Sequence, residues 1–255
     1  MQPEVADRLV ELNHRFYQSF AGPFSESRLR LQPGVVRILE KIPNETSVLD
    51  LGCGGGTLAA FLIERGFRGA YLGLDFSPGL LENARESVAS AYRHSEMPAS
   101  PAARFEFKQA DLAGPAWEDG LPREKFEYIL AFATLHHIPG AELRLRLLSQ
   151  IRRHISDDGR FIHSNWQFLN SERLRGRILP WELAGLSPDD VDPGDALLDW
   201  RRGGEGQRYA HHFLPEELQS LADQSGFTIE AQFFSDGREG NLGLYQVWAL
   251  PQDSD

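Results

Sequence analysis

Residues 47–57 read Ser-Val-Leu-Asp-Leu-Gly-Cys-Gly-Gly-Gly-Thr and constrain the fold more than any other stretch of the chain. The mostly apolar residues at 48–51 are typical of a buried strand, and turn-forming glycines follow at once. From Thr57 onward, apolar residues recur with helical spacing as far as Gly66. Glycines expose bare backbone to a ligand, and a helix start offers unpaired N–H groups. The strand, loop and helix therefore predict half of a nucleotide-binding unit.

Two classes of ligand use such a loop. A dinucleotide is bound by the pattern G-x-G-x-x-G/A, which fails at Thr57 when counted from Gly52 but fits from Gly54 to Ala59. Asp50 separates the classes, because a carboxylate two residues before the first glycine would crowd a pyrophosphate. It suits a cationic or hydrogen-bond-donating ligand. A simple strand-to-helix turn capped by Asp50 is the structural alternative.

Composition bounds the class of protein. The chain has 255 residues, of which 41% are hydrophobic and 25% charged, as in a globular protein with a large core. The net charge of −11 gives no overall attraction to nucleic acid or to anionic lipid. Cys53 is the single cysteine, no stretch is apolar for the ~18 residues of a membrane span, and the N-terminus lacks a signal-peptide pattern. A cytoplasmic location without membrane attachment is expected.

Two further acids, like Asp50, lie at or near the end of a predicted strand. Residues 70–75 form a second predicted strand that ends in Asp75, and the alternating residues 105–109 form a third that leads to Asp111. The carboxyl ends of parallel strands border the ligand crevice of an open sheet. We therefore expect the three carboxylates to line one cleft.

The remaining pattern completes an α/β chain. Helices are expected at 3–20, 33–42, 78–92, 141–155 and 215–224, and further strands at 126–132, 160–166, 227–235 and 242–250. The last two strands are joined by a short connection and should be antiparallel. Residues 167–212 fit no element of the sheet and are too long for an ordinary connection, so an insertion is expected there.

The pattern Asp50-x-Gly52-x-Gly54-x-Gly56 and the segment 133–139, Ala-Thr-Leu-His-His-Ile-Pro, resemble the class I S-adenosylmethionine-dependent methyltransferases. The resemblance covers about residues 44–250. It implies an α/β Rossmann-like fold, with a mostly parallel seven-stranded sheet and a C-terminal antiparallel strand. The expected units are an N-terminal helical lid at 1–43, a cofactor-binding domain at 44–166 and 213–255, and an inserted substrate cap at 167–212.

The resemblance also implies a site for S-adenosylmethionine. The expected contacts are Asp50, Gly52, Cys53, Gly54, Gly56, Asp75, Phe76, Asp111, Leu112, Phe132 and Ala133. Asp50 would order the loop and favour the cationic end, Asp75 would hold the ribose, and Asp111 would lie near the adenine amino group. Tyr17 and Arg28 are expected at the methionine carboxylate.

The chemistry implied is an in-line methyl transfer, for which placing the nucleophile against the methyl group supplies most of the rate. A general base is needed only for a protonated nucleophile, and His136 or His137 suits that role. The alternative for either histidine is a structural cap of the loop. No H-x-x-x-H or cysteine cluster predicts a metal, and Cys53 is expected to be a small loop residue without nucleophilic function.

The inserted segment is expected to carry the substrate contacts. These are Arg201, Arg202, Arg208 and His211, together with Trp166 just before the segment. The arginines are included because a guanidinium pairs with carboxylate or phosphate. A solvated, charge-balanced cap is the alternative, since several aspartates accompany the arginines.

Three functions stay open at this point. The first is methyl transfer to an O or N nucleophile of a small molecule. The second is a tRNA wobble-uridine carboxymethyl methyltransferase, a subgroup to which residues 24–28, 194–200 and 208–213 are similar, although an acidic chain is ill suited to RNA. The third is a nicotinamide-dependent oxidoreductase on a related fold. A non-catalytic binding partner that keeps the fold is a further alternative.

Overall fold

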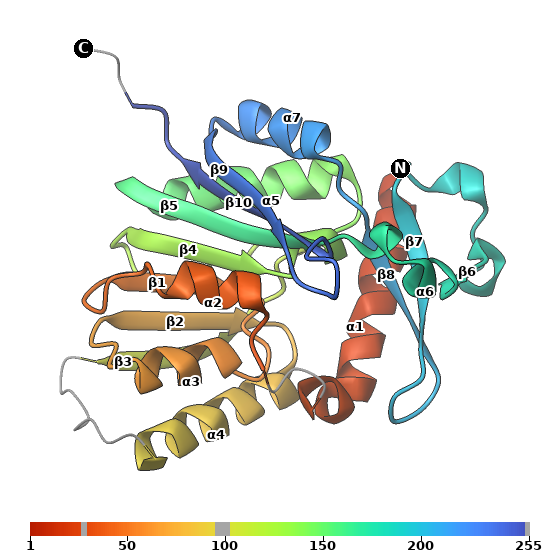
Figure 1. Cartoon of the computed structure of the whole chain (residues 1–255). Helices are drawn as coiled ribbons and strands as arrows, with labels where there is room; N and C mark the ends of the chain where they lie inside the picture. The colour runs from red at the N-terminus through yellow and green to blue at the C-terminus, as the bar shows by residue number, and fades with distance from the viewer. Residues whose placement is uncertain (27–29, 95–102, 253–255) are drawn as a thin grey trace.

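A computed structural model of the chain describes residues 1–26, 30–94 and 103–252, with residues 24–26 described by their backbone alone. Its centre is a seven-stranded sheet in the order β3-β2-β1-β4-β5-β10-β9 (Figure 1). The strands are β1 (Ser47–Leu51), β2 (Ala70–Asp75), β3 (Arg104–Gln109), β4 (Phe126–Phe132), β5 (Ile155–Trp166), β9 (Thr228–Ser235) and β10 (Gly243–Ala249). β10 runs antiparallel to both of its neighbours, while the pairs from β3 to β5 are parallel. The predicted sheet and its antiparallel C-terminal strand are confirmed.

Helices cover both faces of this sheet. On one face lie α2 (Pro33–Leu39), α3 (Thr57–Glu64) and α4 (Pro78–His94), and on the other lie α5 (Ala141–His154) and α7 (Pro215–Ser225). Each layer has its own apolar core: Leu39 and Leu62 pack on Val48 in one, and Leu148 and Leu218 contribute to the other. Apolar spacing in these helices gives each a single buried face. None of the helices that the structure describes has the length and apolar character of a membrane span.

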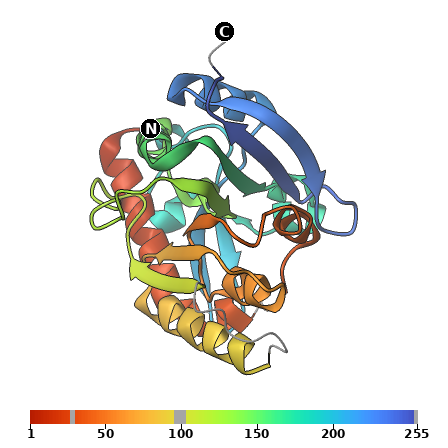
Figure 2. The same cartoon turned by 90° about the vertical axis from the view of Figure 1, so that its left-hand side faces the viewer.

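The inserted residues build a second sheet. β6 (Ile178–Leu179), β7 (Asp195–Trp200) and β8 (Gly206–His211) pair in antiparallel order, with the short helix α6 (Glu172–Arg175) before them. Viewed along the main strands, this small sheet lies behind the large one, at the carboxyl ends of the parallel strands (Figure 2). These three strands form a sheet of their own, separate from the seven-stranded sheet.

The first helix, α1 (Pro3–Glu26), packs against β8 at the same end of the molecule. The sequence predicted that it would end at about residue 20, before Gly22-Pro23, but the helix continues and is kinked at Phe20, where φ is −118° and ψ is 19°. Pro23 lacks an N–H, and its ring presses on the turn before it, so the chain bends one turn upstream rather than leaving the helix.

Candidate functional site

A cavity of about 550 Å³ opens at the carboxyl ends of the parallel strands, beside α1. It brings together most of the predicted site residues: Tyr17, Asp50, Gly52, Cys53, Gly54, Asp75, Phe76, Asp111, Leu112, Phe132, Ala133, His137 and Trp166. The three strand-end carboxylates thus line one cleft, as expected. Arg28 lies outside the described residues, and the arginine that lines the cavity from this part of the chain is Arg30.

The glycine loop adopts backbone geometry that other residues rarely reach. Gly52, Gly54 and Gly56 have φ values of 77°, 53° and 75°. A Cβ on Gly54 would meet nothing within 4 Å, so bare backbone faces the cavity there. A Cβ on Gly56 would lie 2.7 Å from the Cα of Ala84. Gly56 was expected to contact the cofactor, but it does not line the cavity and instead allows α4 to approach the loop.

Four N–H groups of the loop donate within the protein. Those of Gly52 and Cys53 donate to Leu74 O, at 2.8 and 2.9 Å, and that of Gly54 donates to Asp75 Oδ2 at 3.0 Å. The N–H of Gly56 donates to Cys53 O at 3.1 Å. A pyrophosphate on a helix start needs N–H donors, and these four already have acceptors in the protein.

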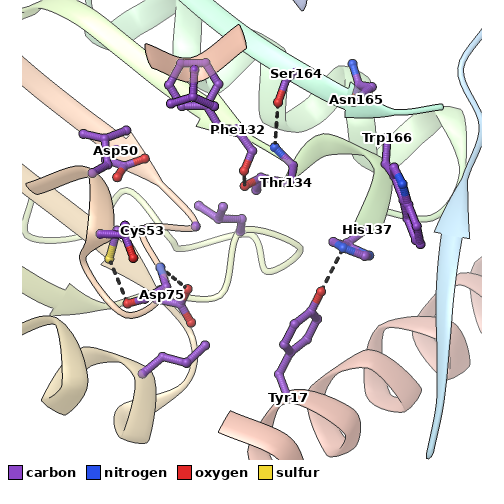
Figure 3. Close-up of a pocket in the computed structure, with 18 of the residues that line it drawn as sticks. Tyr17, Asp50, Cys53, Asp75, Phe132, Thr134, His137, Ser164, Asn165 and Trp166 are labelled. Atoms are coloured by element: carbon purple, nitrogen blue, oxygen red, sulfur yellow. Dashed lines mark hydrogen bonds between the residues drawn. The ribbon is translucent and has the colours of Figure 1, made fainter. Parts of the chain in front are cut away.

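Asp75 ties the loop to the next helix. Its Oδ2 accepts from the Gly54 N–H (Figure 3), and its Oδ1 accepts from the Ser77 N–H at 2.9 Å. Burial raises the pKa of this carboxyl, and the two backbone donors act against the rise. Each carboxylate oxygen keeps acceptor capacity toward the cavity, which suits ribose hydroxyls.

Asp50 is buried behind the loop and paired with a tyrosine. Its Oδ2 accepts from the Tyr71 hydroxyl at 2.5 Å. Burial raises the pKa of Asp50 to about 7, although the bond from Tyr71 acts in the opposite direction. A cation in the cavity would favour the ionised form of this acid.

Asp111 has a partner that the sequence patterns did not reveal. His14 of α1 places Nε2 3.3 Å from Asp111 Oδ1 and stacks its ring on Phe76, with centroids 4.5 Å apart. Burial would raise the pKa of Asp111, but His14 and the backbone N–H groups of Ala113 and Gly114 outweigh it and lower the pKa. The hydrogen bond with Asp111 raises the pKa of His14. A hydrogen-bonded histidine–aspartate pair thus joins α1 to the edge of the cavity.

The chain turns sharply after β4. Ala133 has a φ of 53°, unusual for a residue with a side chain, and its N–H lies 3.1 Å from Ser164 Oγ and 3.0 Å from Ser164 O. Thr134 Oγ1 donates to Leu51 O at 2.9 Å. These bonds hold a backbone conformation that would otherwise be strained, and they aim the following 3₁₀ turn, Leu135–His137, at the cavity.

His137 is fixed by contacts on both ring nitrogens. Nδ1 lies 3.0 Å from the carbonyl oxygen of Tyr209, which can only accept, so Nδ1 carries the proton. Nε2 is then the acceptor for the Tyr17 hydroxyl, 2.8 Å away (Figure 3). Tyr17 was expected at the methionine carboxylate, but its hydroxyl is directed to His137. The pair stands on the cavity wall opposite the glycine loop.

His136 was the other candidate base, and its position favours the structural alternative. Its side chain is 1% exposed and does not line the cavity. Its Nδ1 accepts from the backbone N–H of Trp166 at 3.2 Å. His136 therefore joins the turn after β4 to the end of β5.

Four expected substrate contacts of the insertion lie away from the cavity. Arg201 is at the exposed end of the β7–β8 hairpin, paired with Asp199 at 2.6 Å, and Arg202 is also exposed. Arg208 is buried, its guanidinium 4.9 Å from the ring of Trp166. His211 is buried among carboxylates. None of the four lines this cavity, because charge alone does not indicate which side of a hairpin a residue will face.

The sequence patterns missed several residues of the cavity. His14 and Asn13 lie one turn before Tyr17 on α1, and Ser164 and Asp236 line the far side. Asn13 donates to the carbonyl oxygens of His137 and Tyr209, at 3.3 Å each. The sequence did hold one signal for Asn13 and His14. Residues three and four apart share a helix face, so both could have been placed on the same face of the helix as Tyr17.

Fold and cavity together define an α/β protein with a ligand-sized cavity at the carboxyl ends of its parallel strands. The profile of a family described as a methyltransferase domain matches residues 24–232. The chain belongs to this methyltransferase family. The resemblance and the enzyme class expected from the sequence are confirmed, and the oxidoreductase alternative is set aside.

Individual relatives agree with this membership. A protein of Encephalitozoon cuniculi with a provisional methyltransferase name is 27% identical over 218 residues, which are 85% of this chain and 87% of that one. The tRNA (carboxymethyluridine(34)-5-O)-methyltransferase of Schizosaccharomyces pombe is 22% identical over 86% of this chain and 90% of its own length. A SAM-dependent methyltransferase from Methanosarcina mazei shares the fold, with a TM-score of 0.64, 20% identity and coverage of 87% of this chain and 99% of its own.

Proposed function

We propose that this methyltransferase uses S-adenosylmethionine to methylate a hydroxyl or amine of a small molecule, and that Tyr17 and His137 take up the proton. The observation that carries the proposal is the Tyr17–His137 hydrogen bond of 2.8 Å, on the cavity wall across from the glycine loop. A base is useful only where the nucleophile begins with a proton.

The residues of the cavity fit this cofactor. Gly54 leaves open space for a ligand against the backbone, and Asp75 and Asp111 present carboxylate oxygens for ribose hydroxyls and the adenine amino group. Asp50 offers negative charge that suits a sulfonium. The volume of about 550 Å³ lies within the ~300–1,000 Å³ usual for ligand pockets. Bound S-adenosylmethionine would supply a methyl group on a sulfonium, with a neutral thioether as leaving group.

Tyr17 and His137 can carry a proton away from the methyl acceptor. An acceptor O–H or N–H beside Tyr17 gives its proton to the Tyr17 oxygen, while Tyr17 passes its own hydroxyl proton to Nε2 of His137. Nδ1 keeps its proton and its bond to Tyr209 O, so the resulting imidazolium stays in place. The acceptor atom meanwhile gains the methyl group. Holding the two reactants in line is the other contribution of the chain.

We propose the same division of the chain as the sequence predicted. Residues 1–43 act as a lid, since Tyr17 and His14 reach the cavity from α1. Residues 167–212 act as a cap, since β8 holds His137 through Tyr209. The cytoplasmic location stays a prediction.

A tRNA substrate is the second candidate. It is favoured by the similarity to the Schizosaccharomyces pombe enzyme over most of both chains. A second cavity of about 780 Å³ lies on the outer side of α1, lined by Arg8, Arg15 and Arg201 together with Phe20 and Trp200. Arginines and aromatic rings are the groups that hold unpaired nucleotides.

One assay separates the two candidates. The protein is incubated with methyl-labelled S-adenosylmethionine and with small-molecule, tRNA and protein fractions of cell extract, each with and without ribonuclease. Label in the small-molecule fraction that ribonuclease does not affect supports the proposal. Label confined to tRNA and lost on ribonuclease treatment supports the second candidate, and no label in any fraction contradicts both.

A further inference from the structure

Five side chains form a closed ring of hydrogen bonds where the inserted sheet meets the methyltransferase core. Arg144 of α5 donates to Glu217 of α7 at 3.0 Å and to the hydroxyl of Tyr209 at 3.0 Å. That hydroxyl donates to Asp195 of β7 at 2.7 Å. His211 closes the ring, with Nδ1 2.6 Å from Asp195 and Nε2 2.9 Å from Glu217. We call this set of five the ionic ring.

The ionic ring is mostly buried. Arg144 and His211 are each 1% exposed, and the side chain of Asp195 is fully buried, while that of Glu217 is 33% exposed. Arg144 and His211 therefore both face the two carboxyl groups of Asp195 and Glu217. Buried ion pairs add little net stability compared with apolar packing, so their effect here is better sought in positioning.

Two bonds lead from the ionic ring to His137. Arg144 Nε donates to the carbonyl oxygen of Ile138, next to His137, at 2.9 Å. The carbonyl of Tyr209 accepts from His137 Nδ1, and the N–H of Tyr209 donates to Asn13 Oδ1 at 2.8 Å. Tyr209 is thus held by its hydroxyl at one end and holds His137 with its backbone at the other.

We propose that Arg144 and Tyr209 are positioning residues, which fix the tautomer and orientation of His137 through the ionic ring. The proposal deepens the function proposed above and rests on it. The inserted sheet then does more than cover the cavity, since β8 sets which nitrogen of His137 faces Tyr17. The ring nitrogen that carries the proton is set by the hydrogen bond that the other end of the imidazole makes.

The test reads the tautomer directly. Protein labelled with ¹⁵N-histidine is compared by NMR as wild type, Tyr209→Phe and Tyr92→Phe, and the His137 signals are assigned by their loss in His137→Gln. Tyr209→Phe removes only the hydroxyl, and Tyr92 on α4 is a matched tyrosine outside the ionic ring. The expected result is an Nδ1–H tautomer in wild type and Tyr92→Phe, and at least a twofold smaller Nδ1–H fraction in Tyr209→Phe.

An unchanged Nδ1–H fraction in folded Tyr209→Phe overturns the proposal. If that variant does not fold, Glu217→Gln at the most exposed member of the ionic ring gives the same test with the same expected result. The tautomer is read without cofactor or acceptor. Calorimetric titration with S-adenosylhomocysteine is run in parallel, and a wild-type protein that does not bind it contradicts the proposed function alone.

Discussion

The two sides of the cavity are held in different ways. On the side proposed for the nucleoside, N–H groups of the loop at 52–56 donate to the Leu74 carbonyl and to the Asp75 carboxylate at the end of β2. On the acceptor side, Tyr17 and His137 are 120 residues apart in the chain and meet through side chains that α1 and β8 bring together. Substitutions on the nucleoside side should therefore change cofactor binding, whereas those on the acceptor side should change methyl transfer and spare the cofactor.

The largest effect is expected on the acceptor side. His137→Gln removes the group that receives the proton from Tyr17, and general-base catalysis contributes typically ~10²–10⁴-fold. We expect kcat to fall by about 100-fold or more with the acceptor found by the labelling assay. The affinity for S-adenosylhomocysteine, measured by calorimetry, should stay within a factor of about two of wild type, because His137 lies on the cavity wall across from the loop.

The matched control for this prediction is His154→Gln, at the end of α5 and paired with Glu118. It should leave kcat unchanged. A His137→Gln protein with wild-type kcat would contradict the proposed proton transfer from Tyr17 to His137.

Asp75→Ala is the corresponding test on the nucleoside side. It removes the acceptor of both the Gly54 and Ser77 N–H groups, and each unpaired buried donor costs roughly 1–3 kcal/mol. The affinity for S-adenosylhomocysteine should fall by about 100-fold in calorimetric titration. The exposed acid Asp189 is the control, and Asp189→Ala should bind like wild type. Equal affinity in both variants would contradict the assignment of Asp75.

Two glycines test the close packing behind the loop. Gly56 and Gly120 have nearly the same φ, 75° and 77°, but only at Gly56 would a Cβ meet backbone, at 2.7 Å from Ala84. Alanine in this left-handed conformation costs roughly 1–2 kcal/mol at either site, and overpacking adds about 2 kcal/mol at Gly56. Urea unfolding should show Gly56→Ala less stable than Gly120→Ala by that difference. Equal stability of the two variants would mean that α4 can shift freely away from the loop.

The smallest effect concerns pH. Asp50 has a folded pKa of about 7, raised from 3.8 by burial, so the folded chain keeps a proton that the unfolded chain loses. Its contribution to stability is greatest near pH 4 and is lost as the pH rises to about 7. The ionised acid in turn attracts a sulfonium. The affinity for S-adenosylmethionine relative to the neutral S-adenosylhomocysteine should rise by up to about tenfold through pH 7.

Asp50→Asn is the control for the pH dependence. The affinity ratio of the two ligands should then be flat between pH 6 and pH 8. A ratio that still rises in this variant would assign the pH dependence to another group, of which His14 beside Asp111 is the first to examine.

The sequence predicted the residues on the loop side of the cavity better than the contacts on the Tyr17–His137 side. Asp50, Asp75 and Asp111 follow from strand ends, because each lies within two residues of the end of its own strand and parallel strands align their carboxyl ends. The contact of His14 with Asp111 and that of Tyr17 with His137 depend on the path of α1 across those ends, which no local pattern fixes. Arg201 was misplaced for a related reason: it follows the buried Trp200 at a hairpin end, and alternation alone does not say which face meets the cavity.

The central claim is that a sulfonium nucleoside binds at the carboxyl ends of β1, β2 and β3. A crystal structure of the chain saturated with S-adenosylhomocysteine tests it most directly. The expected result is that the ribose hydroxyls bind Asp75 and that the adenine amino group lies within hydrogen-bond distance of Asp111. Ligand bound elsewhere, or an empty cavity in crystals grown at saturating ligand, would contradict it.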